Sequence, residues 1–403
     1  MTGPDPDLVE SDLVEVTVGA PAPGGHCVAR LGGERGQVVF VRHALPGERV
    51  TAEITEIHRG YLRADAVRIH ERSPDRVTPP CPYARPRGCG GCDLQHVADG
   101  AQLDWKTAVV REQLIRLAGL SGTAVDALDV AVRRLPGGLL DWRSRVRYAV
   151  DATGRAGLLQ HRSHQVVPID RCRIAHPRVQ ALEITGRQWP ETTSVEAVAS
   201  TGGDVSVLTD HTLIDGPPEV REIAAGREWR MPPEGFWQVH PAAADTLVAA
   251  VLDLLDPAVG ETAWDLYGGA GLFAAAVAER TTARITVVES SPAGVASARA
   301  NLADLTGVEV VAAKVDVALT RRRIIGPVDL VVLDPPRTGA GAAVVRGIAA
   351  AGPRAVAYVA CDPAALARDI KSFTSLGWTV DALRGYDCFP MTQHIECVAL
   401  LTP

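Results

Sequence analysis

The sequence predicts an α/β protein in which a doubly wound, mostly parallel sheet follows an N-terminal small β-barrel and a strand-rich central domain. Three observations predict this fold. Apolar strands alternate with helical segments from residue 262 onward, short strands separated by turns occupy residues 13–70, and the span between them is strand-rich and basic. At roughly 100–200 residues per domain, the chain of 403 residues accommodates such a division.

Residues 11–71 form the predicted barrel. Val14–Val18 alternates apolar and polar residues, and Gln37–Arg42 and Val50–Ile57 supply further short strands. A glycine-rich turn at 20–25 follows the first of them. Short strands joined by such turns are typical of a small barrel.

Residues 72–235 form the predicted central domain, and its strand-rich part begins near residue 131. In its helix, at 102–120, apolar residues such as Leu103, Val109 and Leu114 recur at near-helical spacing. This helix could pack on the third predicted domain, residues 236–403.

The charge pattern gives two opposed indications about nucleic acid. The net charge of −7 argues against a nucleic-acid partner. The span 131–176, however, holds nine Arg and three Asp, a local net charge of about +6. Arg143, Arg145 and Arg147 alternate at strand spacing and could share one face of a sheet, although a solvated polar face would have the same pattern.

The N-terminal residues and the hydropathy of the chain predict the cellular location of the protein. No run of about 18 apolar residues occurs, so we expect no membrane span. Residues 1–11 carry Asp5, Asp7 and Glu10 and no basic, apolar leader. We therefore expect a cytoplasmic protein without a membrane partner, acting as a monomer.

The third domain alternates strands with helices, which indicates a mostly parallel, doubly wound sheet. Its ligand should lie beyond the carboxyl ends of the strands. The predicted strands are Thr262–Tyr267, Arg284–Glu289, Val308–Ala313, Val328–Asp334, Arg354–Ala360 and Ile395–Leu401.

A nucleotide site is predicted where the first of these strands ends. The segment Asp265–Gly271 holds three glycines that let the backbone approach a ligand closely. Glu289 ends the next strand and could accept both hydroxyls of a ribose. Asp316 could bind an adenine amino group or be a solvated loop acid. The motif also suits a dinucleotide-binding dehydrogenase or a tight turn without ligand.

Reactive side chains follow the later strands. Asp334 precedes two prolines that stiffen its loop, and such a motif also serves methylation of amino groups. Cys361 precedes Asp362-Pro363, which reads as a helix start, where the dipole favours a thiolate; a buried structural cysteine is the alternative. His394 and Glu396 share one side of the last strand. A carboxylate in that apolar strand is costly unless it is paired or used.

Three of the eight cysteines cluster in the central domain. Cys81, Cys89 and Cys92 need a fourth ligand, for which Cys172 is the best choice in the chain. In a chain without a signal peptide, metal binding or catalysis is favoured over disulfides. Four thiolates suit tetrahedral zinc or an iron–sulfur cluster.

As a set, these elements resemble the RNA uracil-C5 methyltransferase family, whose members make 5-methyluridine in ribosomal or transfer RNA. The resemblance covers the last ~170 residues. The matching elements, in order, are Phe236–Val239, Asp265–Gly271, Glu289, Asp334–Arg337, Cys361 with Pro363, and Phe389–Glu396.

The resemblance implies a class I, Rossmann-like sheet that uses S-adenosylmethionine. Cys361 would be the nucleophile that adds to uracil carbon 6, making carbon 5 nucleophilic, and Glu396 the base that then removes the carbon 5 proton. The residues that would line the cofactor and reaction site are Gln238, Tyr267, Glu289, Asp316 and Asp334.

The chain departs from the family pattern at four positions. The family often has Asn at His240, Ser at Ala360, Asn at Asp362 and Cys at Gly268. These changes leave the proposed nucleophile and base intact. They put secondary contacts to uracil in doubt, and Asp362 adds a negative charge beside a thiolate.

Two further resemblances concern the first two domains. The cysteine segment is similar to the [4Fe–4S] segment of a subset of this family, which favours that cluster over zinc. Residues 13–70 resemble the TRAM domain, a barrel that binds RNA, although a structural appendage would fit too. The combination implies an RNA partner, with ribosomal RNA (23S) favoured over transfer RNA. An RNA-binding redox sensor without catalysis is the competing class.

Overall fold

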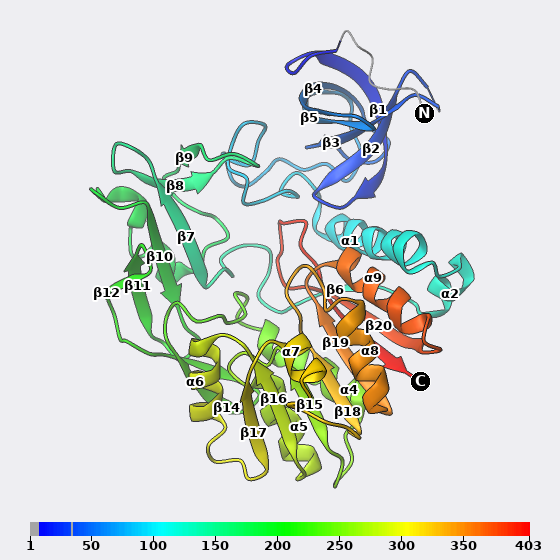
Figure 1. Ribbon diagram of the computed structural model, residues 1–403. Coiled ribbons are helices and arrows are strands. Elements are labelled where there is room, and N and C mark those ends of the chain that lie inside the picture. The colour runs from blue at the N-terminus through cyan, green and yellow to red at the C-terminus, as the bar shows by residue number, and fades with distance from the viewer. Residues whose placement is uncertain (1–7, 34) are drawn as a thin grey trace.

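The computed structural model describes residues 8–33 and 35–403, and so the acidic residues Asp5 and Asp7 lie outside the described part. Three parts are distinct in Figure 1: an N-terminal barrel, a central sheet and a C-terminal sheet layered with helices. In the described part of the chain, no helix is both long enough and apolar enough to span a membrane.

The N-terminal part is a closed five-stranded barrel, as predicted. Strands β1 and β4 close it in antiparallel register, with Val16 opposite Val50. Its inward-facing residues are mostly Val, Ala and Ile, which alternate with exposed ones. The strands are β1 (Leu13–Ala22), β2 (His26–Leu31), β3 (Gln37–Arg42), β4 (Arg49–His58) and β5 (Tyr61–Glu71).

The central part is a six-stranded sheet followed by a two-stranded hairpin. The sheet strands run in the order β12-β11-β10-β7-β8-β9, and every neighbouring pair is antiparallel. Their bounds are β7 (Arg145–Val150), β8 (Ala156–Leu159), β9 (Val166–Pro168), β10 (Ser194–Ala199), β11 (Val205–Thr209) and β12 (Thr212–Asp215). The hairpin joins β13 (Val220–Ala224) and β14 (Arg227–Met231), and the short helices are α3 (Pro177–Gln180) and η2 (Ile184–Gly186).

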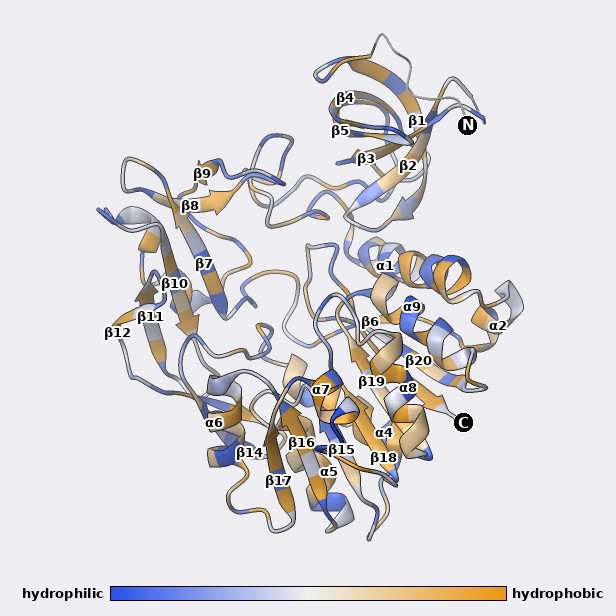
Figure 2. Cartoon of the chain, in the orientation of Figure 1, coloured by the Kyte–Doolittle hydropathy of each residue, from blue (hydrophilic) through white to orange (hydrophobic). Residues whose placement is uncertain are grey.

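The C-terminal part confirms the doubly wound sheet, in the order β17-β16-β15-β18-β19-β21-β20-β6. The first five strands are parallel. All but the edge strand β17 are almost wholly buried, and Figure 2 shows them as mainly hydrophobic, as expected for strands covered on both faces. The bounds are β15 (Ala263–Leu266), β16 (Ile285–Glu289), β17 (Val308–Ala312), β18 (Leu330–Leu333), β19 (Ala355–Ala360), β20 (Thr379–Asp387) and β21 (Glu396–Thr402).

Helices cover both faces of this sheet. On one face, α4 (Ala243–Leu255), α5 (Leu272–Thr281) and α6 (Pro292–Asn301) share one hydrophobic core with the strands. On the other face, α7 (Val315–Thr320), α8 (Ala342–Ala351) and α9 (Pro363–Thr374) share a second core. Strand β15 lies at the topological switch point of the sheet. The next strand in the chain, β16, pairs on one side of it, and the later strand β18 pairs on the other.

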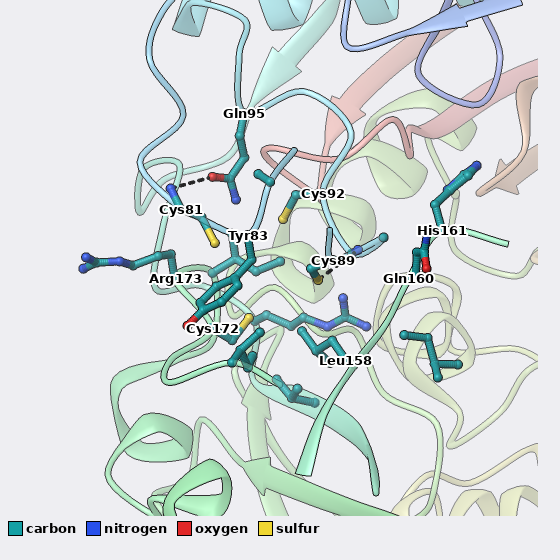
Figure 3. A pocket seen from close by; sticks show the side chains of 18 of the residues that line it. Cys81, Tyr83, Cys89, Cys92, Gln95, Leu158, Gln160, His161, Cys172 and Arg173 are labelled. Atoms are coloured by element: carbon teal, nitrogen blue, oxygen red, sulfur yellow. Dashed lines mark hydrogen bonds between the residues drawn. The ribbon is translucent and has the colours of Figure 1, made fainter. Parts of the chain in front are cut away.

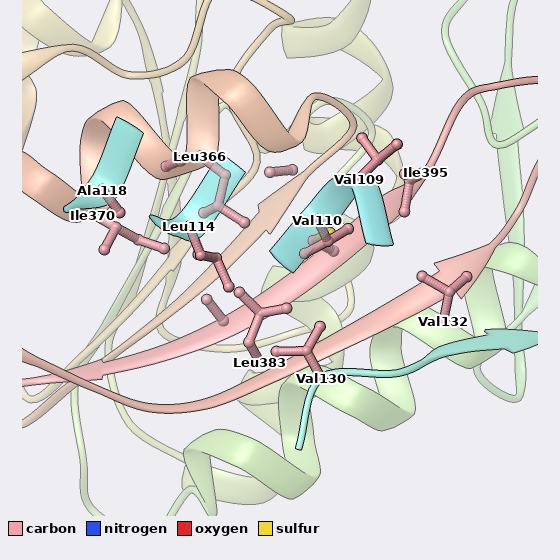
Figure 4. Packing of buried hydrophobic residues seen from close by; sticks show 14 of the residues in the cluster. Val109, Val110, Leu114, Ala118, Val130, Val132, Leu366, Ile370, Leu383 and Ile395 are labelled. Carbon is pink, nitrogen blue, oxygen red and sulfur yellow. The ribbon is translucent and has the colours of Figure 1, made fainter. Parts of the chain in front are cut away.

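Part of the span expected to form the central domain joins the C-terminal sheet. Its helix α1 (Asp99–Gln113), continued by η1 (Leu114–Ala118), packs on α9. Figure 4 shows Val110 and Leu114 of this helix beside Ile370 and Leu383. The adjoining segments are α2 (Gly122–Ala127) and β6 (Val132–Arg134), the latter pairing with β20.

Candidate active site

The ends of five adjacent strands meet at one edge of the C-terminal sheet. Glu289 ends β16, while Tyr267, Asp334 and Cys361 come directly after β15, β18 and β19. Because β21 runs antiparallel to β19, its first residue, Glu396, lies at the same edge. The sheet therefore gathers five of the predicted site residues.

Cys361 and Glu396 face one another across neighbouring strands. Ala360 of β19 pairs with Cys397 of β21, so the next residue on each strand is brought opposite the other. Glu396 is 3% exposed, and its carboxyl is the strongest charge acting on the Cys361 thiol. His394, predicted to share the strand, lies in the loop that precedes β21.

The Cys361 thiol is harder to ionise than the helix start suggested. Burial, then Glu396 and Asp334, raise its pKa to about 11, and only Arg337 lowers it. The N-cap itself is present, since Asp362 accepts a 2.7 Å hydrogen bond from the Ala365 amide. Burial and acidic neighbours thus oppose the thiolate that the helix start favours, and the ionisation of Cys361 stays a prediction.

The acidic pair beside Cys361 also resists ionisation. Burial and the nearby Asp334 raise the pKa of Glu396 well above its usual range. Burial and Asp265 raise the pKa of Asp334. A proton is therefore readily held among these carboxyls, as general acid–base chemistry requires.

Glu289 is held in place by the glycine loop and the start of the next helix. Its Oε2 accepts from the Gly269 amide at 3.0 Å, and its Oε1 accepts from Ser290 and Ser291 at 2.7 and 2.6 Å. A Cβ at Gly294 would lie 2.9 Å from the Glu289 side chain, so only glycine leaves it room. The carboxylate is fixed at the edge where a ribose would lie.

Asp265 and Tyr267 shape the loop between β15 and α5. Asp265 Oδ2 accepts from the Ala274 amide at 2.8 Å, and its Oδ1 is buried without a partner. Tyr267 has a φ of +65°, an uncommon conformation that points to a functional constraint. Burial and the charge of Asp316, exposed in the first turn of α7, raise the pKa of Tyr267 to about 12. Asp316 therefore lies near Tyr267.

Gln238 lies apart from the sheet, in the loop between β14 and α4, and its place in the cofactor site stays a prediction. Arg145 anchors this loop, donating to the carbonyls of Pro233 and Gly235 at 2.8 and 2.7 Å and pairing with Glu222 at 3.2 Å. Arg145 thus has a structural role. Because these contacts engage its side chain, Arg143, Arg145 and Arg147 do not form one solvated face.

A buried ion pair beneath the site had not been expected. Lys106 of α1 and Asp387 of β20 are both fully buried, with Nζ 2.6 Å from Oδ1, and Lys106 also donates to the Phe389 carbonyl at 3.1 Å. The signal was available in the sequence: Lys106 lies three residues from both Leu103 and Val109, on the apolar stripe of its helix.

Two of the departures from the family pattern have a local reason. A Cβ at Gly268 would lie 2.5 Å from Val287 Cγ1, so glycine is required opposite this valine. His240 is buried and stacks on Trp142, with ring centroids 5.7 Å apart. Nothing in the structure explains Ala360.

The four predicted cysteines line one cavity of about 370 Å³ between the segment 81–95 and the central sheet. Figure 3 shows the sulfurs of Cys81, Cys89, Cys92 and Cys172 around it. Gly90 allows the loop to close, because a Cβ there would lie 2.6 Å from the His161 backbone.

Burial dominates the electrostatics of this cavity. It raises the pKa of Cys89 to about 11 and also raises the pKa of Cys172, and Arg143 opposes the rise at both thiols. The Gly91 amide donates to Cys89 Sγ at 3.3 Å. In the described ranges, no three His, Cys, Asp or Glu side chains are close enough to hold a single metal ion.

Comparisons with known proteins match both the N-terminal and the C-terminal part of the chain to described families. Residues 219–403 match the family described as tRNA (Uracil-5-)-methyltransferase, and residues 11–67 match the TRAM domain. The chain is similar to a solved structure, the tRNA (uracil-54, C5)-methyltransferase of Pyrococcus abyssi in complex with S-adenosyl-L-homocysteine. The TM-score is 0.71 at 21% identity, covering 96% of this chain and 100% of the other.

Two relatives from Streptomyces extend over the whole chain. An uncharacterized RNA methyltransferase of Streptomyces avermitilis is 48% identical over 426 residues, which cover 96% of this chain and 98% of the relative. An uncharacterized RNA methyltransferase of Streptomyces coelicolor is 47% identical, covering 99% of this chain and 94% of the relative.

Proposed function

Because the chain belongs to the family of S-adenosylmethionine-dependent RNA (uracil-5-)-methyltransferases, we propose that it methylates carbon 5 of a uridine through a covalent Cys361 adduct. The observation that carries this proposal is the strand register that sets Cys361 opposite the buried Glu396, with Asp334 next to them.

Each of these side chains has one role in the proposed reaction. Cys361 Sγ, once deprotonated, bonds to carbon 6, and the electron pair moves to carbon 5. S-adenosylmethionine supplies the methyl group that carbon 5 receives. Glu396 then takes the remaining carbon 5 proton, the Cys361–carbon 6 bond breaks, and the double bond returns. A uracil in a stacked segment must first be extruded to reach Cys361.

The methyl donor would lie along the strand ends on the other side of Asp334. Glu289, fixed by three backbone amides, would accept the ribose hydroxyls. Tyr267 and Asp316 would border the adenine, while Asp334 and Gln238 would lie nearer the reacting atoms.

The class of RNA is proposed from the first two domains. We favour ribosomal RNA (23S), because the barrel and the four-cysteine cavity occur together in this chain. Transfer RNA is the second candidate, supported by the description of the matched family and of the Pyrococcus abyssi structure.

The cysteine cavity supports a bound [4Fe–4S] cluster held by Cys81, Cys89, Cys92 and Cys172. Four thiols line one cavity, and four thiolates suit a [4Fe–4S] cluster or tetrahedral zinc; the similarity of this segment to the iron–sulfur segment of the family favours the cluster. Such a cluster would tie the 81–92 loop to the loop that carries Cys172.

One experiment tests the proposed reaction. Purified protein and S-adenosylmethionine are incubated with unmodified ribosomal and transfer RNA, and 5-methyluridine is mapped by mass spectrometry. New 5-methyluridine in ribosomal RNA supports the full proposal, and its appearance only in transfer RNA would correct the substrate. Its absence from both pools would overturn the reaction.

A second measurement tests the cluster. The visible absorption of anaerobically purified protein, together with its iron, sulfide and zinc content, separates the two ligands. Broad visible absorption with iron and sulfide supports the cluster, and zinc alone contradicts it.

A further inference from the structure

Asp93 joins the barrel to the loop that leads to Glu396. This loop, residues 388–395 between β20 and β21, is called the catalytic loop below. The Asp93 side chain is 8% exposed. Its Oδ1 accepts from Arg42 Nη2 of the barrel at 3.2 Å, and its Oδ2 accepts from the Gln393 amide at 3.2 Å. One buried carboxylate therefore bridges two parts of the fold.

The turn between β1 and β2 reaches the same loop. The Gly24 amide donates to Gln393 Oε1 at 3.1 Å. A Cβ at Gly25 would lie 2.5 Å from the Asp93 Cβ, and Gly25 has a φ of +72°, so both the packing and the backbone require glycine. Pro23 lines a cavity of about 80 Å³ together with Cys361. The barrel turn is thus part of the wall beside the nucleophile.

Other segments hold the start of the catalytic loop. The Leu94 amide donates to the Met391 carbonyl at 2.9 Å, and Gln102 Oε1 accepts from the Met391 amide at 3.0 Å. Asp93 and Leu94 directly follow Cys92. The segment leaving the cysteine cavity therefore binds the catalytic loop at both Met391 and Gln393.

We propose that Asp93 is a positioning residue for the uridine methylation described above: by holding Gln393 against the barrel, it places Glu396 at the carbon 5 proton. The inference rests on the proposed function. Glu396 lies three residues after Gln393, at the point where β21 begins. Hydrogen bonds to an ionised group are about twice as strong as neutral ones, and misplacement of a reacting group by about 1 Å can cost about 100-fold in rate.

This placement predicts a specific defect. Addition of Cys361 and methyl transfer both precede the step that needs Glu396. In the full-length Asp93→Ala protein, turnover should fall about 10- to 100-fold, with the KM for RNA changed less than about threefold. The methylated enzyme–RNA adduct should then accumulate and survive denaturing electrophoresis, because its release waits for proton removal.

Two further variants distinguish a positioning role of Asp93 from a general loss of protein stability. Asp65 also faces Arg42, at 3.8 Å, but is a barrel residue on β5, so Asp65→Asn should turn over like the wild type. Gln393→Leu removes the bond to Gly24 without altering the segment next to Cys92, and it should accumulate adduct as well. The iron content of every variant is measured in parallel.

Three results would overturn the inference. Asp93→Ala could turn over at the wild-type rate, could slow without retaining adduct, or could lose activity only in proportion to lost iron while Gln393→Leu stays normal. A wild-type protein that forms no 5-methyluridine on any RNA overturns the proposed function first, and that result is visible before any variant is compared.

Discussion

The two cysteine sites of this molecule are built in different ways. Cys361 lies at the end of a buried strand, and its partners Asp334 and Glu396 come from the strands on either side. Cys81, Cys89, Cys92 and Cys172 lie in irregular segments around a cavity. Sheet register sets Cys361 opposite Glu396 without a ligand, whereas the second site depends on loops and on the ligand that the thiols bind.

The electrostatic surroundings of the two sites also differ. Burial is the largest cause that raises the pKa of both Cys361 and Cys89, in each case to about 11. At Cys361, neighbouring carboxyls contribute to the rise, whereas at Cys89 and Cys172 the other cavity thiols contribute and Arg143 opposes it. Carboxyls beside a thiol can exchange a proton with it, whereas a group of thiols offers the ligands that a bound metal needs.

The largest effect should come from removing the Cys361 thiol. Cys361→Ala should lower 5-methyluridine formation by about 10⁴-fold or more, because no other group supplies the bond to carbon 6. The thermal midpoint should stay near that of the wild type. Quantitative mass spectrometry of the RNA measures the rate, and Cys27→Ala, which removes a buried barrel thiol, is the control. Full turnover by Cys361→Ala would instead favour methylation of an amino nitrogen at the Asp334 loop.

A cavity cysteine should matter less for chemistry and more for stability. Cys172→Ser should lose bound iron and lower the thermal midpoint, since a ligand that binds only the folded state stabilises it. Activity should fall about 10- to 100-fold, because the strand register of Cys361 and Glu396 is unchanged. Iron analysis, thermal unfolding and the RNA assay measure these effects. Activity as low as that of Cys361→Ala would contradict the separation of the two sites.

The same contrast explains what could be predicted from the sequence. Glu289 was predictable because it ends an apolar strand, and Asp334 and Cys361 because each directly follows one; the ends of parallel strands share one edge. The short β6 and the role of Arg145 could not be predicted, since three residues carry little pattern and the contacts of Arg145 are with distant segments. The raised pKa of Cys361 depends partly on Asp334 and Glu396 from the two flanking strands, which reasoning from the local helix start does not include.

Substitution of Glu289, at the edge of the sheet, should have a smaller effect that is mainly on cofactor binding. Glu289→Gln leaves one acceptor oxygen where the carboxylate has two, both of which already bind backbone amides. We expect the KM for S-adenosylmethionine to rise about tenfold, equal to about 1.4 kcal/mol, with kcat changed less than about threefold. Steady-state kinetics at saturating RNA measure both. A fall in kcat with an unchanged KM would place Glu289 in the chemistry and not in cofactor binding.

The smallest effect, and the only gain, should follow Asp362→Asn. Asp362 is among the acidic groups that raise the pKa of the Cys361 thiol. Asparagine can accept the same hydrogen bond from Ala365 and is an equally good N-cap. Removing the charge should lower the pKa of the thiol and increase the thiolate fraction at every pH below it. Adduct formation near pH 7 should therefore rise about two- to threefold, for a shift of about 0.3–0.5 pH units.

The measurement for Asp362→Asn separates formation of the Cys361 adduct from the later proton removal and release. RNA containing 5-fluorouridine traps the adduct, because carbon 5 then has no proton for Glu396 to remove, and rapid-quench rates between pH 6 and pH 9 follow the thiol alone. The wild-type rate should increase with pH across this range, since it lies below the raised pKa of about 11. The Asp362→Asn curve should lie parallel to it at lower pH. A curve displaced to higher pH would mean that Asp362 assists ionisation of Cys361, and acidic neighbours would then no longer distinguish Cys361 from the cavity thiols.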